Sequence, residues 1–296
     1  MRFAFTSEQL EFRDGLRALL EKECTAAHVR DAWTNETGRA PGLWEKLVDL
    51  GVTSVLAPKS QGGFGLEFVD LVLLLEEAGR YAVPEPIVET AAFGVPLLGR
   101  DVTIAGGHEL VPWADTADVV VTFAGRYERD TMKLTPRPSV DGARRMFLVE
   151  GPTEALDIGD AFQRGVLGFA AQQCGLADRM IEMTVEYVKE RKQFGAAVGS
   201  FQAVKHHLAN TRLALEFARP LVYRAAATLD PVHISMAKRK ADAAALLAAK
   251  VGLQCHGAIG YTTEYDLHLY MKRAWALARS WGDASFHRGR VAQAIL

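Results

Sequence analysis

Apolar residues recur at helical intervals along the N-terminal third of the chain. Thr6 and Gln9 stand at the spacing of a capping box, and leucines follow Phe12 every three or four positions, so a helix is expected to begin here. Gly51 and Pro84 mark the ends of later helical segments. The helices predicted for this part cover residues 7–24, 43–50, 68–81 and 90–98.

The pattern changes at about Asp101. Val119–Phe123 and Met146–Val149 are short runs rich in β-branched and aromatic residues, and glycine, proline and aspartate separate them, which is typical of strands. This strand-like part covers about fifty residues, enough for a few strands but small for an independent sheet domain.

From Gly159 onward the helical periodicity returns. The helices expected here cover residues 159–191, 201–229, 234–253, 265–279 and 284–296. In the third of them a stripe of small residues predicts close approach to a neighbouring helix: Ala237, Ala241, Ala244, Ala245 and Ala248. We therefore expect a mainly α-helical chain with a helical domain at residues 1–100, a reduced small β-domain at 101–157 and a helical bundle at 158–296.

Composition argues against several classes of function. With 296 residues, 49% of them hydrophobic, the chain can bury a large core, and its formal net charge of -2 argues against nucleic acid as a partner. The start of the chain lacks an apolar signal segment, and no apolar run reaches the roughly 18 residues of a membrane span. We therefore expect a cytoplasmic protein with no membrane partner. Lys238, Arg239 and Lys240 are expected to lie on a solvated helix face.

The cysteines and histidines do not form a metal-binding or disulfide pattern. Cys24, Cys174 and Cys255 are odd in number and widely spaced, so we expect buried thiols. His206 and His207 are neighbours, and neighbouring side chains point about 100° apart on a helix, which prevents them from readily sharing a metal. A metal site is therefore not expected.

Several segments resemble a single known family. The order of helices, short strands and helices is similar to the acyl-CoA dehydrogenase fold, in which a small β-domain separates a helical domain from a four-helix bundle. The segment Tyr187–Gly195 reads YVKERKQFG and, with the following Phe201-Gln202, resembles the family's Y-x-x-x-R-x-x-F-G and F-Q signature. Gln254–Tyr261 resembles its Q-x-x-G-G-x-G-Y motif, and Pro58–Gly65 its P-x-x-x-G-G-x-G turn. These matches occur in the family's order and span most of the chain.

The resemblance implies FAD as the cofactor. The pyrophosphate of the dinucleotide needs a fixed cation and close main-chain N–H groups, which Arg191, Gly257 and Gly260 would supply. Gly195 would end the helix and turn the chain so that Phe194 packs on the ring system. In the family these motifs face the flavin of a neighbouring subunit. The expected contacts are Arg191, Gln193, Phe194, Gln202, Gln254, His256, Gly257 and Gly260. By itself Arg191 equally fits a helix C-terminus, and Gly257 and Gly260 an ordinary helix stop.

The family's general base is absent from its usual positions. Acyl-CoA oxidation needs a carboxylate that removes the α proton, and many members carry it as the Glu of a Y-E-G-T segment, where alignment on Gly282 places Trp281. Other members carry it on the first bundle helix, at the position of Gly165. A slip of one or two residues would bring in Asp160 or Asp283, and Asp283 equally suits the N-cap of the last helix.

The missing base and the short β-domain together predict a shortened subunit. The β-domain has half the family's usual length and lacks its flavin-contacting strand segments, and some bacterial members pair a full-length catalytic subunit with a shortened partner in a heterotetramer. We expect such a subunit of an enzyme that introduces an α,β double bond into an acyl-CoA, in fatty acid or sterol degradation, with electron-transfer flavoprotein as acceptor. The alternatives are a self-sufficient homo-oligomer that uses Asp283 and a non-catalytic structural partner.

Overall fold

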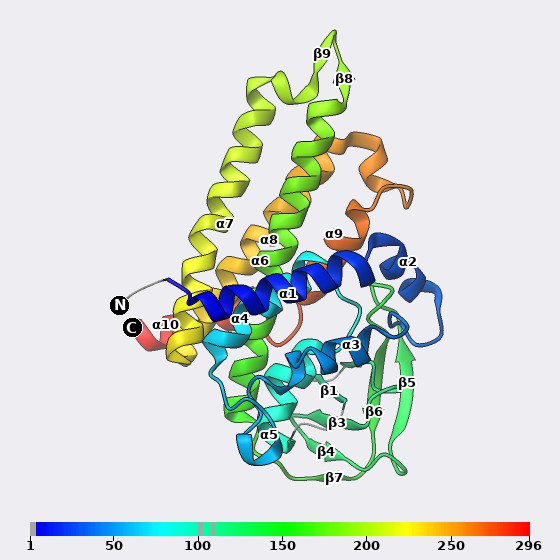
Figure 1. The fold of residues 1–296 in the computed structure, drawn as a ribbon, viewed down its shortest axis with the longest axis vertical. Helices are drawn as coiled ribbons and strands as arrows, with labels where there is room; N and C mark the ends of the chain where they lie inside the picture. The colour runs from blue at the N-terminus through cyan, green and yellow to red at the C-terminus, as the bar shows by residue number, and fades with distance from the viewer. Residues whose placement is uncertain (1–3, 100–102, 108–109) are drawn as a thin grey trace.

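The computed structural model describes residues 4–99, 103–107 and 110–296. Helices dominate it, and long helices of the C-terminal half stand upright in Figure 1 with the strands beside their lower ends. The α-helices are α1 (Ser7–Glu23), α2 (Ala26–Thr34), α3 (Leu43–Asp49), α4 (Phe68–Arg80), α5 (Val95–Leu98), α6 (Gly159–Glu190), α7 (Gln202–Thr228), α8 (Pro231–His256), α9 (Leu267–Leu277) and α10 (Ala284–Ile295). Shorter helical turns are η1 (Val52–Ser54), η2 (Lys59–Gln61), the π-helix η3 (Val88–Gly94), η4 (Val198–Ser200) and η5 (Gly257–Tyr261).

The first helix begins where the sequence predicts. The Thr6 hydroxyl accepts the Gln9 N–H, and the Gln9 side-chain oxygen accepts the Thr6 N–H, so the capping box is confirmed. The other helices expected in this part are α3, α4 and η3 with α5. Helix α2 was not predicted, because only Val29 and Ala32 are buried among its nine residues, too few for a periodic pattern.

The strands form two small sheets. They are β1 (Ile104–Gly107), β2 (Leu110–Pro112), β3 (Val119–Thr122), β4 (Gly125–Tyr127), β5 (Lys133–Arg137), β6 (Met146–Glu150) and β7 (Thr153–Glu154). One sheet has the order β1-β3-β4-β7, with β1 and β3 parallel, and the other has the order β2-β6-β5. Only β3 and β6 were predicted, because the other strands have two to five residues and carry glycine, proline or charged side chains. The predicted boundary at residues 100–101 lies outside the described residues.

The C-terminal bundle is built on α6, α7 and α8, and α4 packs on α6 (Figure 1). The alanine stripe predicted on α8 is buried where this helix meets its neighbours, so that prediction is confirmed. The far ends of α6 and α7 extend beyond the N-terminal helices and carry a short hairpin, β8 (Lys192–Gln193) and β9 (Ala196–Ala197).

Helices α4 and α6 cross at two glycines. A Cβ on Gly175 would lie 1.9 Å from the carbonyl oxygen of Glu76, and one on Gly79 would lie 2.1 Å from that of Gln172. The two backbones are therefore in direct contact, and a larger residue at either position would push the helices apart.

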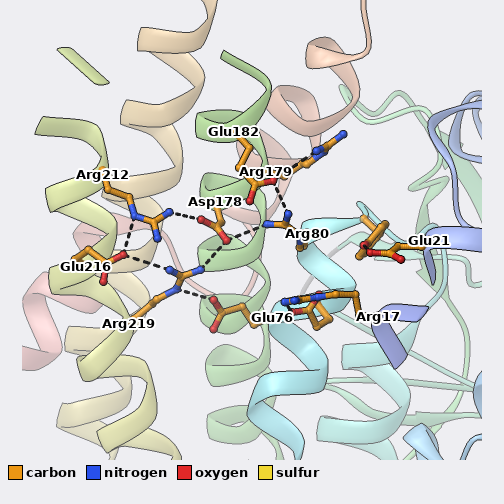
Figure 2. Close-up of polar contacts among 12 residues, drawn as sticks. Arg17, Glu21, Glu76, Arg80, Asp178, Arg179, Glu182, Arg212, Glu216 and Arg219 are labelled. Carbon is orange, nitrogen blue, oxygen red and sulfur yellow. Dashed lines mark hydrogen bonds and ion pairs between the residues drawn. The ribbon is translucent and has the colours of Figure 1, made fainter. Parts of the chain in front are cut away.

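Ion pairs between charged side chains link α4 and α6 to α7 (Figure 2). Asp178 on α6 accepts from Arg80 at 3.0 Å, from Arg219 at 2.9 Å and from Arg212 at 2.5 Å. The buried carboxylate of Glu76 on α4 also accepts from Arg219, at 2.7 Å. Because these ion pairs bridge three helices, they orient the N-terminal helices on the bundle.

The expectation of a solvated face on α8 is wrong for Lys238. This side chain is fully buried, and its Nζ donates to both carboxylate oxygens of Asp242, at 2.8 and 2.6 Å, and to the carbonyl oxygen of Leu277 at 3.0 Å. A carboxylate one turn along the same helix compensates the buried ammonium, so this lysine does not need water. Arg239 and Lys240 are exposed, as expected.

The expectation from apolar run length also needs a correction at α8. The segment Pro231–Tyr261 is long and apolar enough to cross a membrane by length and composition, and 44% of its apolar window is buried inside the structure. Core helices of bundles meet the same criterion, and α8 packs against α6, α7 and α10. Its packing identifies it as a bundle helix.

Replacing Gly175 by alanine should destabilise the fold by at least about 2 kcal/mol, because the methyl group would overlap the Glu76 carbonyl and separate α4 from α6. Gly15 is the matched control, since it is exposed within α1 and no described atom lies within 4 Å of its Cβ position. Gly15→Ala should stabilise by about 0.5–1 kcal/mol. Urea unfolding measures both changes, and equal effects at the two positions would contradict the close crossing.

Candidate cofactor-binding site

The predicted cofactor contacts come from two segments that are distant in sequence and meet at one end of the bundle. We call this end the bundle tip: residues 187–202, from the end of α6 to the start of α7, and residues 252–265, from the end of α8 to the approach to α9. Figure 1 shows the β8–β9 hairpin of the tip projecting away from the other two sheets. This surface is therefore available to another molecule.

The first segment forms a tight hairpin. Helix α6 ends at Glu190, and the N–H of the capping residue Arg191 donates to the Tyr187 carbonyl at 2.9 Å. The hairpin turns at Phe194 and Gly195, whose φ angles are 53° and 78°. Positive φ at both central residues is the geometry that two-residue hairpins favour. Gly195 thus turns the chain, as predicted, but α6 ends before it at Glu190, so the prediction that Gly195 ends the helix is wrong.

The side chains of the hairpin face solvent. Phe194 is 92% exposed, and its ring lies edge-on to Phe201 at a centroid distance of 6.3 Å. Arg191, Gln193 and Gln202 are exposed as well, and within the described ranges Arg191 forms no ion pair. A phenylalanine this exposed beside an unpaired guanidinium suits a site that another molecule completes.

The second segment exposes main chain at the end of α8. Gly257 caps the helix with φ 66° and ψ -139°, and no described atom lies within 4 Å of its Cβ position, so backbone conformation is what requires glycine there. Gly260 is buried, and a Cβ on it would lie 3.0 Å from the Cβ of His256. The helix-stop interpretation holds for Gly257 and not for Gly260. Gln254 is exposed on the last turn of α8.

Tyr187 and His256 bring the two segments together. Their rings stack with centroids 4.3 Å apart and planes 22° apart, and Tyr187 Oη donates to the His256 carbonyl at 3.4 Å. His256 is only 4% exposed, so it supports the tip from inside. The Arg191 segment and the Gln254–Gly260 segment therefore adjoin.

The groups at the tip fit a flavin dinucleotide. The exposed Arg191 can pair with a pyrophosphate, and the open space at Gly257 lets main-chain N–H groups approach phosphate oxygens. Phe194 offers an apolar ring face to a flat ring system.

Trp281 fills the region where the sequence places the missing base. Its indole is 8% exposed, stacks on Phe162 at 5.6 Å and 12°, and meets Phe93 edge-on at 4.7 Å. A Cβ on Gly165 would lie 2.4 Å from the indole, and one on Gly106 would lie 3.3 Å from it. The two alternative base positions, Trp281 and Gly165, are thus in contact, and neither carries a proton acceptor.

Neither aspartate that the sequence offered as a base has a suitable setting. The Asp283 carboxylate accepts the N–H groups of Phe286 and Ser285, each at 2.9 Å, and these bonds lower the pKa of Asp283 below its ordinary value. The N-cap interpretation is confirmed, and a carboxylate of lowered pKa is a weaker base. Asp160 is exposed in the first turn of α6.

The sequence analysis missed an aromatic cleft beside Trp281. It encloses about 590 Å³ and is lined by Phe123, Phe162, Arg279, Trp281, Gly282, Asp283 and Phe286. These residues come from the end of β3, the first turn of α6 and the segment around the start of α10, at spacings that form no motif. The cleft can accommodate an apolar group, and among the described residues of its lining Asp283 is the one that carries a carboxylate.

This chain is similar in sequence to known proteins. The family models for the N-terminal domain and the C-terminal domain of acyl-CoA dehydrogenase match residues 6–99 and 157–296. Acyl-CoA dehydrogenase IpdE2 of Mycolicibacterium smegmatis is 34% identical over 93% of this chain and 95% of its own length. Acyl-CoA dehydrogenase FadE34 of Mycobacterium tuberculosis is 30% identical over 94% of this chain and 46% of its own length.

The fold recurs in a solved complex. A chain of the ChsE4-ChsE5 complex from Mycobacterium tuberculosis superposes with a TM-score of 0.85, covering 99% of this chain and 98% of that chain, at 22% sequence identity. At that identity the similarity shows the shared fold alone. Because both family models and a relative 34% identical over nearly the whole length agree, this chain belongs to the acyl-CoA dehydrogenase family of FAD-containing oxidoreductases.

Proposed function

We propose that this chain is the shortened, non-catalytic subunit of a heteromeric acyl-CoA dehydrogenase. Its bundle tip completes the FAD site of a full-length subunit, which supplies the general base and the β-domain that covers the flavin. The observation that carries the proposal is the packing of Trp281 against Gly165, because the two positions at which family members carry the base hold an indole and a bare glycine.

Each exposed group at the tip has one task in this proposal. When bound, FAD would supply a hydride acceptor for the β hydrogen of the acyl-CoA. Arg191 pairs with the pyrophosphate, main-chain N–H groups near Gly257 donate to phosphate oxygens, and Phe194 shields an apolar ring face from water. None of these groups removes a proton from substrate. The tip can therefore bind and orient the cofactor, and the α proton must leave to the partner's carboxylate.

The lengths of the relatives support a two-chain assembly. IpdE2 is as short as this chain, since the match covers 93% of one and 95% of the other. In FadE34 the matched segment is 46% of the protein, so a segment like this one is joined there to a further stretch of similar length. The ChsE4-ChsE5 complex contains a chain of this fold matched over 98% of its length. A separately encoded partner would supply here what that further stretch supplies in FadE34.

The full-length partner would bind the acyl-CoA and pass electrons to electron-transfer flavoprotein in the cytoplasm. A fatty acyl or sterol-derived acyl group is the expected substrate. This chain would contribute to the cofactor site alone.

The isolated chain should purify without flavin colour, and co-expression with a full-length acyl-CoA dehydrogenase encoded beside it should give a yellow, active complex. In that complex Arg191→Gln should raise the Kd for FAD by about 10- to 100-fold, because a hydrogen bond to a charged group contributes roughly 1.5–3 kcal/mol. Flavin fluorescence during titration of the apo-complex measures this Kd.

Arg239→Gln is the matched control, since it removes the same charge from an exposed position in the first half of α8. It should leave the Kd for FAD unchanged. A yellow, active homo-oligomer would contradict the proposal and favour a self-sufficient enzyme. If the complex is active and Arg191→Gln leaves its Kd for FAD unchanged, the role of the tip is contradicted and a purely structural partner is favoured.

The loop that carries Trp281 is held in place by a buried histidine. Trp281 has a φ of 60°, which costs a non-glycine residue about 1–2 kcal/mol. His287 of α10 is fully buried, with Nε2 3.1 Å from the Trp281 carbonyl oxygen and Nδ1 3.2 Å from Ser235 Oγ. Because a carbonyl oxygen can only accept, Nε2 carries the proton. The neutral imidazole thus keeps the indole in the base site.

Acid should loosen this anchor. Burial, and after it the nearby Lys238 ammonium, lower the pKa of His287 to about 4, below the ordinary value of 6.5. The unfolded chain therefore binds the proton more readily, and stability is lost as pH falls from 6.5 toward 4. Between pH 7 and pH 4.5 the wild type should lose about 2 kcal/mol more than His287→Gln, measured by urea unfolding. Equal losses would contradict a neutral, buried His287.

A further inference from the structure

The bundle tip contains an aromatic contact whose role the proposed function leaves open. Tyr187 lies one helical turn before Arg191, and its ring stacks on His256, the last residue of α8. Tyr265, just before α9, contacts both rings, with its ring centroid 4.7 Å from that of His256 and 5.8 Å from that of Tyr187. The two segments of the tip, which are distant in sequence, thus meet in one aromatic cluster.

The imidazole of His256 is fixed to the last turn of α8 by a hydrogen bond. Nδ1 lies 2.7 Å from the Gly252 carbonyl oxygen, which can only accept, so Nδ1 carries the proton. Burial lowers the pKa of His256, which keeps the ring neutral and leaves Nε2 unprotonated. Nε2 is buried and has no hydrogen-bond partner in the described structure. A phenylalanine at this position could stack in the same way and would bury no unsatisfied acceptor. It could not donate to the Gly252 carbonyl, so this hydrogen bond is what the histidine adds.

The cluster extends the packing of α6 on α8 to the ends of the two cofactor-facing segments. One turn before His256, α8 packs closely on α6 at Gly252, where a Cβ would lie 3.1 Å from Thr184 Oγ1. Beyond it, α8 ends in the open turn at Gly257, and α6 ends in the exposed hairpin after Arg191. Hydrogen bonds from both segments to one pyrophosphate require a fixed separation, which preorganised contacts provide.

We propose that Tyr187 is a positioning residue of the FAD site. Its stack on His256 holds the guanidinium-bearing end of α6 and the glycine-containing end of α8 at the separation that the cofactor's pyrophosphate requires. This inference rests on the proposed function for its ligand, whereas the coupling between the two segments can be tested on the chain alone.

The natural cysteines report on that coupling. Cys255 adjoins His256 and is partly exposed, whereas Cys24 and Cys174 are buried. In the isolated chain Tyr187→Leu should raise the rate at which Cys255 reacts with a chromogenic disulfide reagent by about tenfold. Loss of the aromatic contact would make local opening of the bundle tip around Cys255 more frequent. Tyr187→Phe keeps the ring and should react within about twofold of the wild type.

Counting the reacting thiols separates local from global effects. One fast thiol in Tyr187→Leu supports the inference. An unchanged rate would overturn it, and so would simultaneous reaction of all three thiols, because Tyr187 would then support the whole fold and not the tip specifically.

The cofactor test uses the complex co-purified with the full-length partner, with flavin fluorescence as the readout. Tyr187→Leu should raise the Kd for FAD by about tenfold, with Tyr187→Phe close to the wild type and subunit assembly by gel filtration intact. If Arg191→Gln weakens FAD binding and Tyr187→Leu does not, the positioning role fails while the proposed function stands. If neither variant weakens FAD binding, both fail.

Discussion

The close packing of α6 against α4 and α8 is the constraint on which both functional regions depend. Gly175 brings the α6 backbone into contact with α4, and the alanine stripe of α8 permits a similar approach from another side. Gly165 lies near the start of this 32-residue helix and Arg191 directly follows its end. At about 1.5 Å per residue, Gly165 beside Trp281 and Arg191 at the bundle tip are about 40 Å apart along the helix. One helix therefore fixes the position of each.

Periodicity along the sequence was sufficient where an element is stabilised locally or by one long apolar face. The capping box at Thr6 and the bounds of the long helices α6 and α7 are of this kind, whereas α8 extends three residues further at each end than predicted. The short strands are not, because β1 reads Ile-Ala-Gly-Gly and depends on its pairing with β3, about fifteen residues later in the chain. Lys238 shows the same limit, since its burial depends on Asp242 and on a carbonyl of α9 that no local pattern reveals.

Features of the candidate site that lie within one contiguous motif were predictable from the sequence, and contacts between separate elements were not. The contiguous motifs predicted Arg191, Phe194 and Gly257 as cofactor contacts by residue type, and alignment on Gly282 placed Trp281 where many family members carry the base. The hairpin turn, the stack of Tyr187 on His256 and the contact of Trp281 with Gly165 were not predictable, because each joins residues from separate elements. The family relationship could be predicted from the sequence, whereas the closure of the base site required the structure.

The proposed role as a partner subunit joins two observations, the exposed groups of the bundle tip and the packing of Trp281 against Gly165. The most direct measurement is an electron cryo-microscopy or crystal structure of the complex formed with the full-length partner. The account predicts that Arg191 and the segment Gln254–Gly260 contact the pyrophosphate of an FAD whose flavin ring lies in the partner. An FAD bound instead in the aromatic cleft beside Trp281, with Arg191 in solvent, would contradict it.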